Sequence, residues 1–406
     1  MTQTVFHRAR WICPVNRPPI EGGMVAVTGS TITGAGTKND LKEADGSSVV
    51  DHGDVAILPA FTNAHTHLEL SLLENRTTTG GSFVDWLRSL LCERDKLNHK
   101  DFNHAIACGL DICRKNGTGL IADISNTGRS ADHLNKTLTK SVLFLEAIGL
   151  DPEKLPVCLA EFHALYDRLK IKHPFTGVAA HSPYTVSPEL FSEIHALSAK
   201  EFPILSVHVA ESDNESEFLA GKGPLYDLMR ERNFRDGDWT PPMKSPVQYM
   251  DMLGLLTRDT LCVHLVQVSD SDIELLSQRR PRICLCPRSN QKLRVGNPPV
   301  EKLFRKGLPI ALGTDSLASN DDLSILKEMA RIREIAPVVS PDEIIRMGTI
   351  NGAAALNMEK QLGSIEEGKE ASLISLSVTS SSSGTLYEEI VCDGYRKEIK
   401  WINQPQ

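Results

Sequence analysis

The 406-residue sequence contains no Cys-x-x-Cys motif and no apolar run long enough to span a bilayer. Its first residues, MTQTVFHRARWICPVNRPP, lack the continuous apolar stretch of a signal peptide. The nine cysteines are scattered, and the closest pair, Cys284 and Cys286, has a spacing that places both thiols on one face of a strand rather than in a bridge. These absences predict a cytoplasmic protein whose thiols act as small core residues.

The sequence also lacks an excess of positive charge. It has 44 Lys and Arg against 52 Asp and Glu, a formal net charge of -8, which argues against nucleic acid or an anionic membrane as a partner. Its hydrophobic content of 41% is ordinary for a soluble globular chain. Because 406 residues exceed the usual size of a single core, we expect one large domain and one smaller one.

Both ends of the chain have the composition of short strands. Residues 4 to about 54 include GGMVAVTGSTITGAGT, in which two β-rich pieces flank glycine-containing turns. Residues 363 to about 402 include EASLISLSV and EEIVCDGYRKEIKWI, separated by the Ser-rich loop TSSSSG. We therefore predict that residues 1–54 and 363–406 form one small composite β-sandwich domain.

The middle of the chain, residues 55–362, alternates short apolar strands with helical patterns. An opening strand at LPAFTNAHTH is followed by strand candidates at 118–125, 141–149, 175–187, 203–212, 260–269, 281–290 and 309–319. Helical patterns such as SPELFSEIHALSAKEF, with Ser187 as its cap, lie between them. Eight such units predict an α/β fold, a parallel (β/α)8 TIM barrel, whose catalytic mouth lies at the carboxyl ends of the strands.

Two histidines, His65 and His67, follow the first apolar strand in the stretch NAHTHLE. In an extended segment residues i and i+2 face the same way, so both imidazoles can bind one metal ion. The alternative is a pair of partly exposed histidines in a turn. Further polar residues at strand ends favour the metal site: His181, His208, Glu211, His264 and Asp315. Taken singly, His264 fits a buried core histidine and Asp315 fits the cap of a helix beginning in TDSLASNDDL.

The motifs NAHTHLE, HVAES, VHLVQVS and LGTDSLASN, in this order, resemble those of the metal-dependent amidohydrolase superfamily. The resemblance covers essentially the whole chain and is strongest to the branch that deaminates adenine, guanine, cytosine and triazine rings. The stretch GSIEEGKEASLI resembles a motif of its sandwich domain, with Ser372 where an aspartate is usual. Within the branch, HTHLELS, GSFVDWL, CPRSN and GTDSLASN are most similar to aminodeoxyfutalosine deaminases of a menaquinone route.

This resemblance implies a single divalent metal ion held by His65, His67, His208 and Asp315. Zinc is the expected ion, and iron and manganese accept the same ligands. The fourth strand carries AAHSPY and no lysine, so the carboxylated-lysine bridge of binuclear relatives is not expected. The resemblance also implies that the catalytic residues are Glu211, which moves a proton to the ring nitrogen, His264, which orients the attacking water, and Asp315, which with His264 takes a proton from it.

Six residues are candidates for contact with the substrate. Glu69 can accept hydrogen bonds from ribose hydroxyls, or it is a solvated turn residue. His181 and Tyr184 resemble the substrate-contacting H-x-P-Y turn of nucleoside deaminases in this branch. Phe83 and Trp86 can cover a flat ring, or they belong to a buried helix face.

Arg288, the sixth, can pair with a substrate carboxylate or with a neighbouring acid. Ser289 and Asn290 most simply cap the next element. Trp239, in a Pro-rich stretch, is a candidate lid residue.

The predicted function is therefore metal-dependent release of ammonia from an adenine-bearing nucleoside, with aminodeoxyfutalosine preferred. Alternatives within the enzyme class are deamination of adenosine, methylthioadenosine, S-adenosylhomocysteine or guanine. A different class, a non-catalytic binding protein on the same barrel, is disfavoured by the intact set of strand-end residues. A small-molecule substrate is the expected partner, and a homodimer is a family-level expectation.

Overall fold

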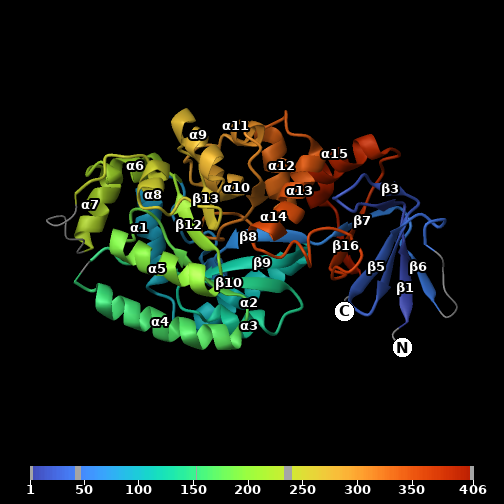
Figure 1. The fold of residues 1–406 in the computed structure, drawn as a ribbon, viewed down its shortest axis with the longest axis horizontal. Helices are drawn as coiled ribbons and strands as arrows, with labels where there is room; N and C mark the ends of the chain where they lie inside the picture. The colour runs from blue at the N-terminus through green and yellow to red at the C-terminus, as the bar shows by residue number, and fades with distance from the viewer. Residues whose placement is uncertain (1–2, 42–46, 152, 233–239, 403–406) are drawn as a thin grey trace.

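The computed structural model describes residues 3–41, 47–151, 153–232 and 240–402, and its centre is an eight-stranded parallel barrel (Figure 1). The strands follow one another in chain order: β8 (Phe61–Thr66), β9 (Thr118–Ser125), β10 (Lys140–Ala147), β11 (Thr176–Ala180), β12 (Leu205–Val209), β13 (Thr260–His264), β14 (Arg282–Leu285) and β15 (Ile310–Leu312). Backbone N–H groups of Thr314 and Asp315 donate to the carbonyl of His65 at 3.0 and 3.1 Å, which joins the last strand to the first at the carboxyl end. The predicted (β/α)8 fold is confirmed.

Helices lie between the barrel strands, as the sequence pattern predicts, and further helices follow the last strand. They are the 3₁₀ helix η1 (Leu68–Leu73), α1 (Phe83–Arg94), α2 (His99–Lys115), α3 (Ser130–Leu134), α4 (Leu155–Lys172), α5 (Pro188–Glu201), α6 (Asp213–Leu219), α7 (Pro224–Glu231), α8 (Pro246–Met252), α9 (Asp270–Arg279), α10 (Pro287–Lys292), α11 (Val300–Arg305), α12 (Ile325–Ile335), α13 (Pro341–Met347) and α14 (Ile350–Ala355). The hydroxyl of Ser187 accepts the N–H of Leu190, so this residue caps α5 as expected. Within the described ranges, no helix has the combination of length and apolar character that crossing a membrane requires.

The barrel strands are buried on both faces, which explains their near-continuous apolar sequences. In β10, Val142 and Phe144 belong to the apolar cluster inside the barrel, whereas Leu143 and Leu145 pack in the layer between barrel and helices. Cys284 and Cys286 both belong to the interior cluster, as their spacing predicts, and both are free thiols.

Two further sheets lie at one side of the barrel, near both ends of the chain (Figure 1). One has the order β5 (Thr31–Gly36), β4 (Met24–Thr28), β1 (Thr4–Arg8) and β6 (Ser48–Asp51), and the other has the order β17 (Ile399–Ile402), β16 (Leu373–Ser377), β7 (Val55–Pro59), β2 (Trp11–Ile12) and β3 (Ile20–Glu21). Strand β16 pairs with β7, so both chain ends contribute to one sheet, and Val25, Ile57 and Leu373 pack in one cluster between the sheets. The predicted domain boundaries stay a prediction. Strand β7, which begins at Val55, pairs with β16 and so belongs to the sandwich sheets rather than to the barrel.

Two local expectations were wrong. The stretch EEIVCDG is not a strand, because its first six residues form the second half of α15 (Ser383–Asp393) and its glycine begins the short 3₁₀ helix η3 (Gly394–Arg396). The Ser-rich loop before it is correspondingly shorter, since α15 already begins at Ser383. No helix begins at Asp315, because the chain continues without regular helix to Ser324, and so the helix-cap alternative for Asp315 is excluded.

Candidate metal centre and active site

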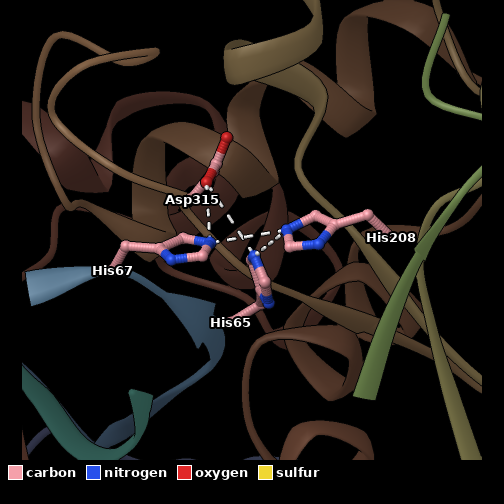
Figure 2. A group of neighbouring side chains, drawn as sticks. All are labelled: His65, His67, His208 and Asp315. Atoms are coloured by element: carbon pink, nitrogen blue, oxygen red, sulfur yellow. Dashed lines mark hydrogen bonds and ion pairs between the residues drawn. The ribbon is translucent and has the colours of Figure 1, made fainter. Parts of the chain in front are cut away.

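Four side chains converge at the carboxyl end of the barrel, and Figure 2 shows three imidazoles and one carboxylate turned toward a common point. His65 lies on β8, His67 directly follows it, His208 lies on β12 and Asp315 follows β15. The Nε2 atom of His208 is 3.1 Å from that of His65 and 3.4 Å from that of His67. Asp315 Oδ1 is 3.8 Å from His65 Nε2 and 3.7 Å from His67 Nε2.

These separations fit the ligands of one tetrahedral cation. Ligand atoms about 2.0–2.1 Å from a zinc ion lie about 3.3 Å from one another in a tetrahedron. The orientation of His208 agrees, because its Nδ1–H donates to the carbonyl of His181 at 2.8 Å and leaves the Nε2 lone pair turned toward the cluster. The four residues therefore form a candidate divalent-metal site.

Burial keeps the histidines in the form that a metal requires. It is the largest cause that lowers the pKa of His65, His67 and His208 below the ordinary value, so all three are neutral near pH 7 and offer a lone pair. Burial acts to raise the pKa of Asp315. The surrounding histidines and a hydrogen bond from Ser319 outweigh this effect, so the pKa of Asp315 lies below its ordinary value. The donor set is thus three neutral nitrogens and one carboxylate.

Two serines that sequence analysis did not assign to the site hold the carboxylate of Asp315. Ser289 Oγ donates to Asp315 Oδ2 at 2.8 Å, and Ser319 Oγ donates to the same oxygen at 2.6 Å. Oδ1 remains turned toward the histidines. The expectation that Ser289 caps the next element was wrong, since the residue lies inside α10 and its hydroxyl is used here.

Glu211 and His264 lie beside the four ligands. His264 Nδ1 contacts Asn290 Oδ1 at 2.9 Å, so the ring donates from Nδ1, and its Nε2 faces Glu211 Oε1 at 3.7 Å. Asn290 thus orients the histidine instead of capping a helix, which corrects its predicted role. Burial, with a smaller contribution from the charge of Asp315, raises the pKa of Glu211 to about 8. Glu215 accepts the backbone N–H of Glu211 at 3.0 Å and fixes that segment.

The backbone is left-handed at three strand ends around this centre. The φ angles are 56° at Ala210, 79° at His264 and 58° at Asp315, values that residues other than glycine rarely adopt. Each such residue costs on the order of 1–3 kcal/mol and persists only where the surrounding contacts hold it. Their position at the ends of β12, β13 and β15 agrees with a functional site at this mouth.

The structure brings several predicted substrate residues close to this centre. The ring of His181 lies 4.9 Å from that of His208 and 5.8 Å from that of Tyr184. Glu69 is buried rather than a solvated turn residue, and it accepts hydrogen bonds from Ser125 and, at 2.6 Å, from Thr127. Their contact with substrate stays a prediction.

Phe83 and Trp86 occupy a buried helix face, the second of the two alternatives considered for them. Both lie on α1 in an apolar cluster with Tyr184 and Phe218, and Trp86 Nε1 donates to the carbonyl of Ala318 at 3.1 Å. Since Ala318 follows Asp315 by three residues, Trp86 supports the loop that carries this carboxylate. Trp239 lies outside the described residues.

Arg288 does not face the metal centre with a free guanidinium, and its expected contact with a substrate carboxylate is not supported. Its Nη1 lies 2.6 Å from Asp322 Oδ1 and 3.8 Å from Glu328 Oε1, and the side chain is only 15% exposed. The structure contains the other arrangement considered from the sequence, in which Arg288 pairs with a neighbouring acid. The sequence could not distinguish the two, because both acids lie more than thirty residues further along the chain.

Comparison with known proteins agrees with the fold. The model of the Amidohydrolase family matches residues 56–400, so this chain belongs to that family. It is 28% identical over 380 residues to a 5-methylthioadenosine/S-adenosylhomocysteine deaminase of Thermoanaerobacter pseudethanolicus, which covers 89% of this chain and 82% of the relative.

Two further relatives carry another name. An aminodeoxyfutalosine deaminase of Deinococcus radiodurans is 28% identical over 341 residues, covering 81% of this chain and 80% of the relative. The crystal structure of Helicobacter pylori aminofutalosine deaminase in complex with methylthio-coformycin is 25% identical, covers 96% of both chains and superposes with a TM-score of 0.84.

Proposed function

We propose that this protein removes the 6-amino group of an adenine-bearing nucleoside by hydrolysis, with aminodeoxyfutalosine as the preferred substrate. The observation that carries the proposal is the convergence of three neutral histidines and Asp315 on one point, with the buried acid Glu211 and His264 beside it. The predicted hydrolytic deaminase of the amidohydrolase family is confirmed by the family match and by relatives that are named deaminases.

The metal proposed for the site is zinc, since imidazole nitrogens with one carboxylate in near-tetrahedral positions suit it. Iron or manganese bind the same donors, and the protein would hold either in the same place. When bound, such an ion lowers the pKa of a coordinated water to about 7 and so supplies a nucleophile near neutral pH. His65, His67, His208 and Asp315 would hold it.

Side chains of the protein carry out the remaining proton transfers. As water adds to C6 of the purine, the ring loses aromaticity and the adjacent nitrogen N1 gains negative charge. Glu211, whose pKa of about 8 keeps a proton available near neutrality, delivers that proton to N1. His264 Nε2 and Asp315 take the proton of the water and pass it to the amino group. Ammonia then leaves, the proton of the C6 hydroxyl returns to Glu211, and a 6-oxo purine remains.

The preference for aminodeoxyfutalosine rests on the motifs of the sequence and on the relatives from Deinococcus radiodurans and Helicobacter pylori. A second candidate, deamination of methylthioadenosine or S-adenosylhomocysteine, is supported by the Thermoanaerobacter relative at the same 28% identity. Guanine and the non-catalytic barrel have no comparable support. A cytoplasmic location and a homodimer stay predictions.

The proposal is tested by measuring ammonia release from a panel of nucleosides. Purified protein loaded with zinc is incubated with aminodeoxyfutalosine, S-adenosylhomocysteine, methylthioadenosine and adenosine, and with guanine as a compound outside the proposed class. We expect the highest kcat/KM for aminodeoxyfutalosine and none for guanine. A higher kcat/KM for S-adenosylhomocysteine or methylthioadenosine would favour the second candidate, and release from guanine alone would contradict the proposal.

A further inference from the structure

Glu146, at the end of the third barrel strand, is a buried acid that faces the mouth of the barrel. In β10 the side chains of Val142 and Phe144 point into the barrel, and the alternation of a strand gives Glu146 the same direction. It is 6% exposed. The next inward-facing residue of this strand after Phe144 therefore carries a carboxylate rather than an apolar side chain. This carboxylate lies at the level of the metal centre.

One oxygen of this carboxylate is held and the other is not. Asn126 Nδ2 donates to Glu146 Oε2 at 2.6 Å, and Arg94 Nη2 donates to Asn126 Oδ1 at 3.1 Å. Glu146 Oε1 is buried and has no hydrogen-bond partner among the described residues. An unpaired buried polar atom costs about 1–3 kcal/mol, more when it is charged, so a bound group that pairs with Oε1 would be strongly favoured.

The neighbours of Glu146 place this oxygen inside the active site. Ligand-capable atoms of Glu146, His181 and His208 lie within 4.8 Å of one another. They do not form a second metal site, because both nitrogens of His208 are already engaged. Its Nδ1–H donates to the carbonyl of His181, and its Nε2 belongs to the four-residue centre. A molecule bound at that centre would instead extend over Glu146.

We propose that Glu146 is a substrate-binding residue that pairs through Oε1 with a sugar hydroxyl of the nucleoside, an inference that rests on the proposed function. The only hydrogen-bond donor of the adenine ring in a nucleoside is its 6-amino group, which the reaction places at Glu211 and His264, on β12 and β13 rather than on β10. The other donors common to adenine nucleosides are the sugar hydroxyls. A hydroxyl also accepts, so it can pair with either protonation state of a carboxyl group.

Arg94 and Asn126 act as positioning residues in this arrangement. Their chain of two hydrogen bonds fixes Oε2 and so directs Oε1 toward the ligand. The described residues place no acidic side chain within ion-pair distance of Arg94. Burial raises the pKa of Glu146 to about 8, and the hydrogen bond from Asn126 and the positive charge of Arg94 oppose this rise. Sequence analysis did not identify Arg94, Asn126 or Glu146. They come from α1, the end of β9 and β10, and only the orientation of their side chains brings them together.

The test compares adenosine with its 2'-deoxy and 3'-deoxy analogues in wild type, Glu146→Ala and the isosteric Glu146→Gln. Apparent affinity is measured as KM, or as Ki against whichever nucleoside the wild type turns over. The matched control is Glu161→Gln, because Glu161 lines the same cavity of about 250 Å³ as Glu146 but is exposed on α4. Metal content is measured for each protein.

In wild type, the analogue that lacks the paired hydroxyl should bind about 5- to 100-fold more weakly than adenosine, the range for leaving a buried hydrogen-bonding group unpaired. Glu146→Ala should remove this preference, Glu146→Gln should reduce it, and Glu161→Gln should leave it intact, all with unchanged metal content. An unchanged preference in both Glu146 variants, or an equal loss for all three nucleosides, would overturn the inference. If the wild type releases no ammonia from any adenine nucleoside, the proposed function itself fails.

Discussion

Removal of the two hydroxyl groups that hold Asp315 should weaken metal binding without changing any ligand. In the double variant Ser289→Ala and Ser319→Ala, Oδ2 of the carboxylate loses both of its donors, at 2.8 and 2.6 Å. The carboxylate is then free to rotate, and its pKa should rise because the Ser319 hydrogen bond helps to lower it. Loss of one such supporting contact typically costs 10- to 100-fold in metal affinity or activity.

We therefore expect each single variant to reduce metal affinity by about 10-fold and the double variant by about 100-fold or more. Because the two hydroxyls share one oxygen, their effects need not add. The assay is competition for zinc with a chromogenic chelator, together with kcat at saturating metal. Ser364→Ala is the control, since Ser364 is a buried serine that accepts from Lys369 outside the metal centre. Wild-type affinity and kcat in the double variant would show that the two hydroxyls do not hold Asp315 in its metal-binding orientation.

Three further predictions concern single residues of the site. Glu211→Gln keeps the size of the side chain but cannot deliver a proton, so kcat should fall by about 100-fold or more with metal content unchanged; metal loss would mean that Glu211 is a ligand. Asn290→Ala removes the acceptor of His264 Nδ1, and we expect kcat to fall by about 10-fold with little change in KM, whereas an unchanged kcat would show that Asn290 does not orient His264. Arg288→Met breaks the ion pair with Asp322 and should lower the free energy of unfolding by about 3 kcal/mol, measured by denaturant titration. It should leave the ratio of kcat/KM for carboxylated and uncharged nucleosides as in wild type, and a selective loss for the carboxylated one would restore Arg288 as a substrate contact.

The sequence was most informative where a residue type and a strand end coincide. Candidate residues were found because each lies at the end of a short apolar run, and parallel strands in a barrel bring such ends to one edge. The resemblance to the amidohydrolase superfamily then selected His65, His67, His208 and Asp315 among them, and these four side chains converge in the structure. The fold followed from the same alternation of strands and helices. In both cases the prediction depends on spacing along the chain, which the sequence contains directly.

Other residues around the candidate metal centre could not be found in this way. The side chains of Ser319, Asn290 and Glu146 contact residues 4, 26 and 20 positions away in the chain, and these contacts depend on side-chain orientation that no periodic pattern contains. The misassigned EEIVCDG stretch has a related cause. A short apolar run fits a strand or a helix equally well by periodicity, and its packing as part of α15 decided the outcome.

We propose that one divalent ion, held by the three histidines and Asp315, enables hydrolysis of an adenine nucleoside. The most direct measurement is ammonia release from aminodeoxyfutalosine and methylthioadenosine by the same protein sample before chelation, after chelation and after addition of zinc, with metal counted per chain. We predict about one ion per chain in the active sample, no turnover after its removal and recovery on zinc addition. Full activity in the metal-free sample, or no ammonia from either nucleoside at one zinc per chain, would contradict the account.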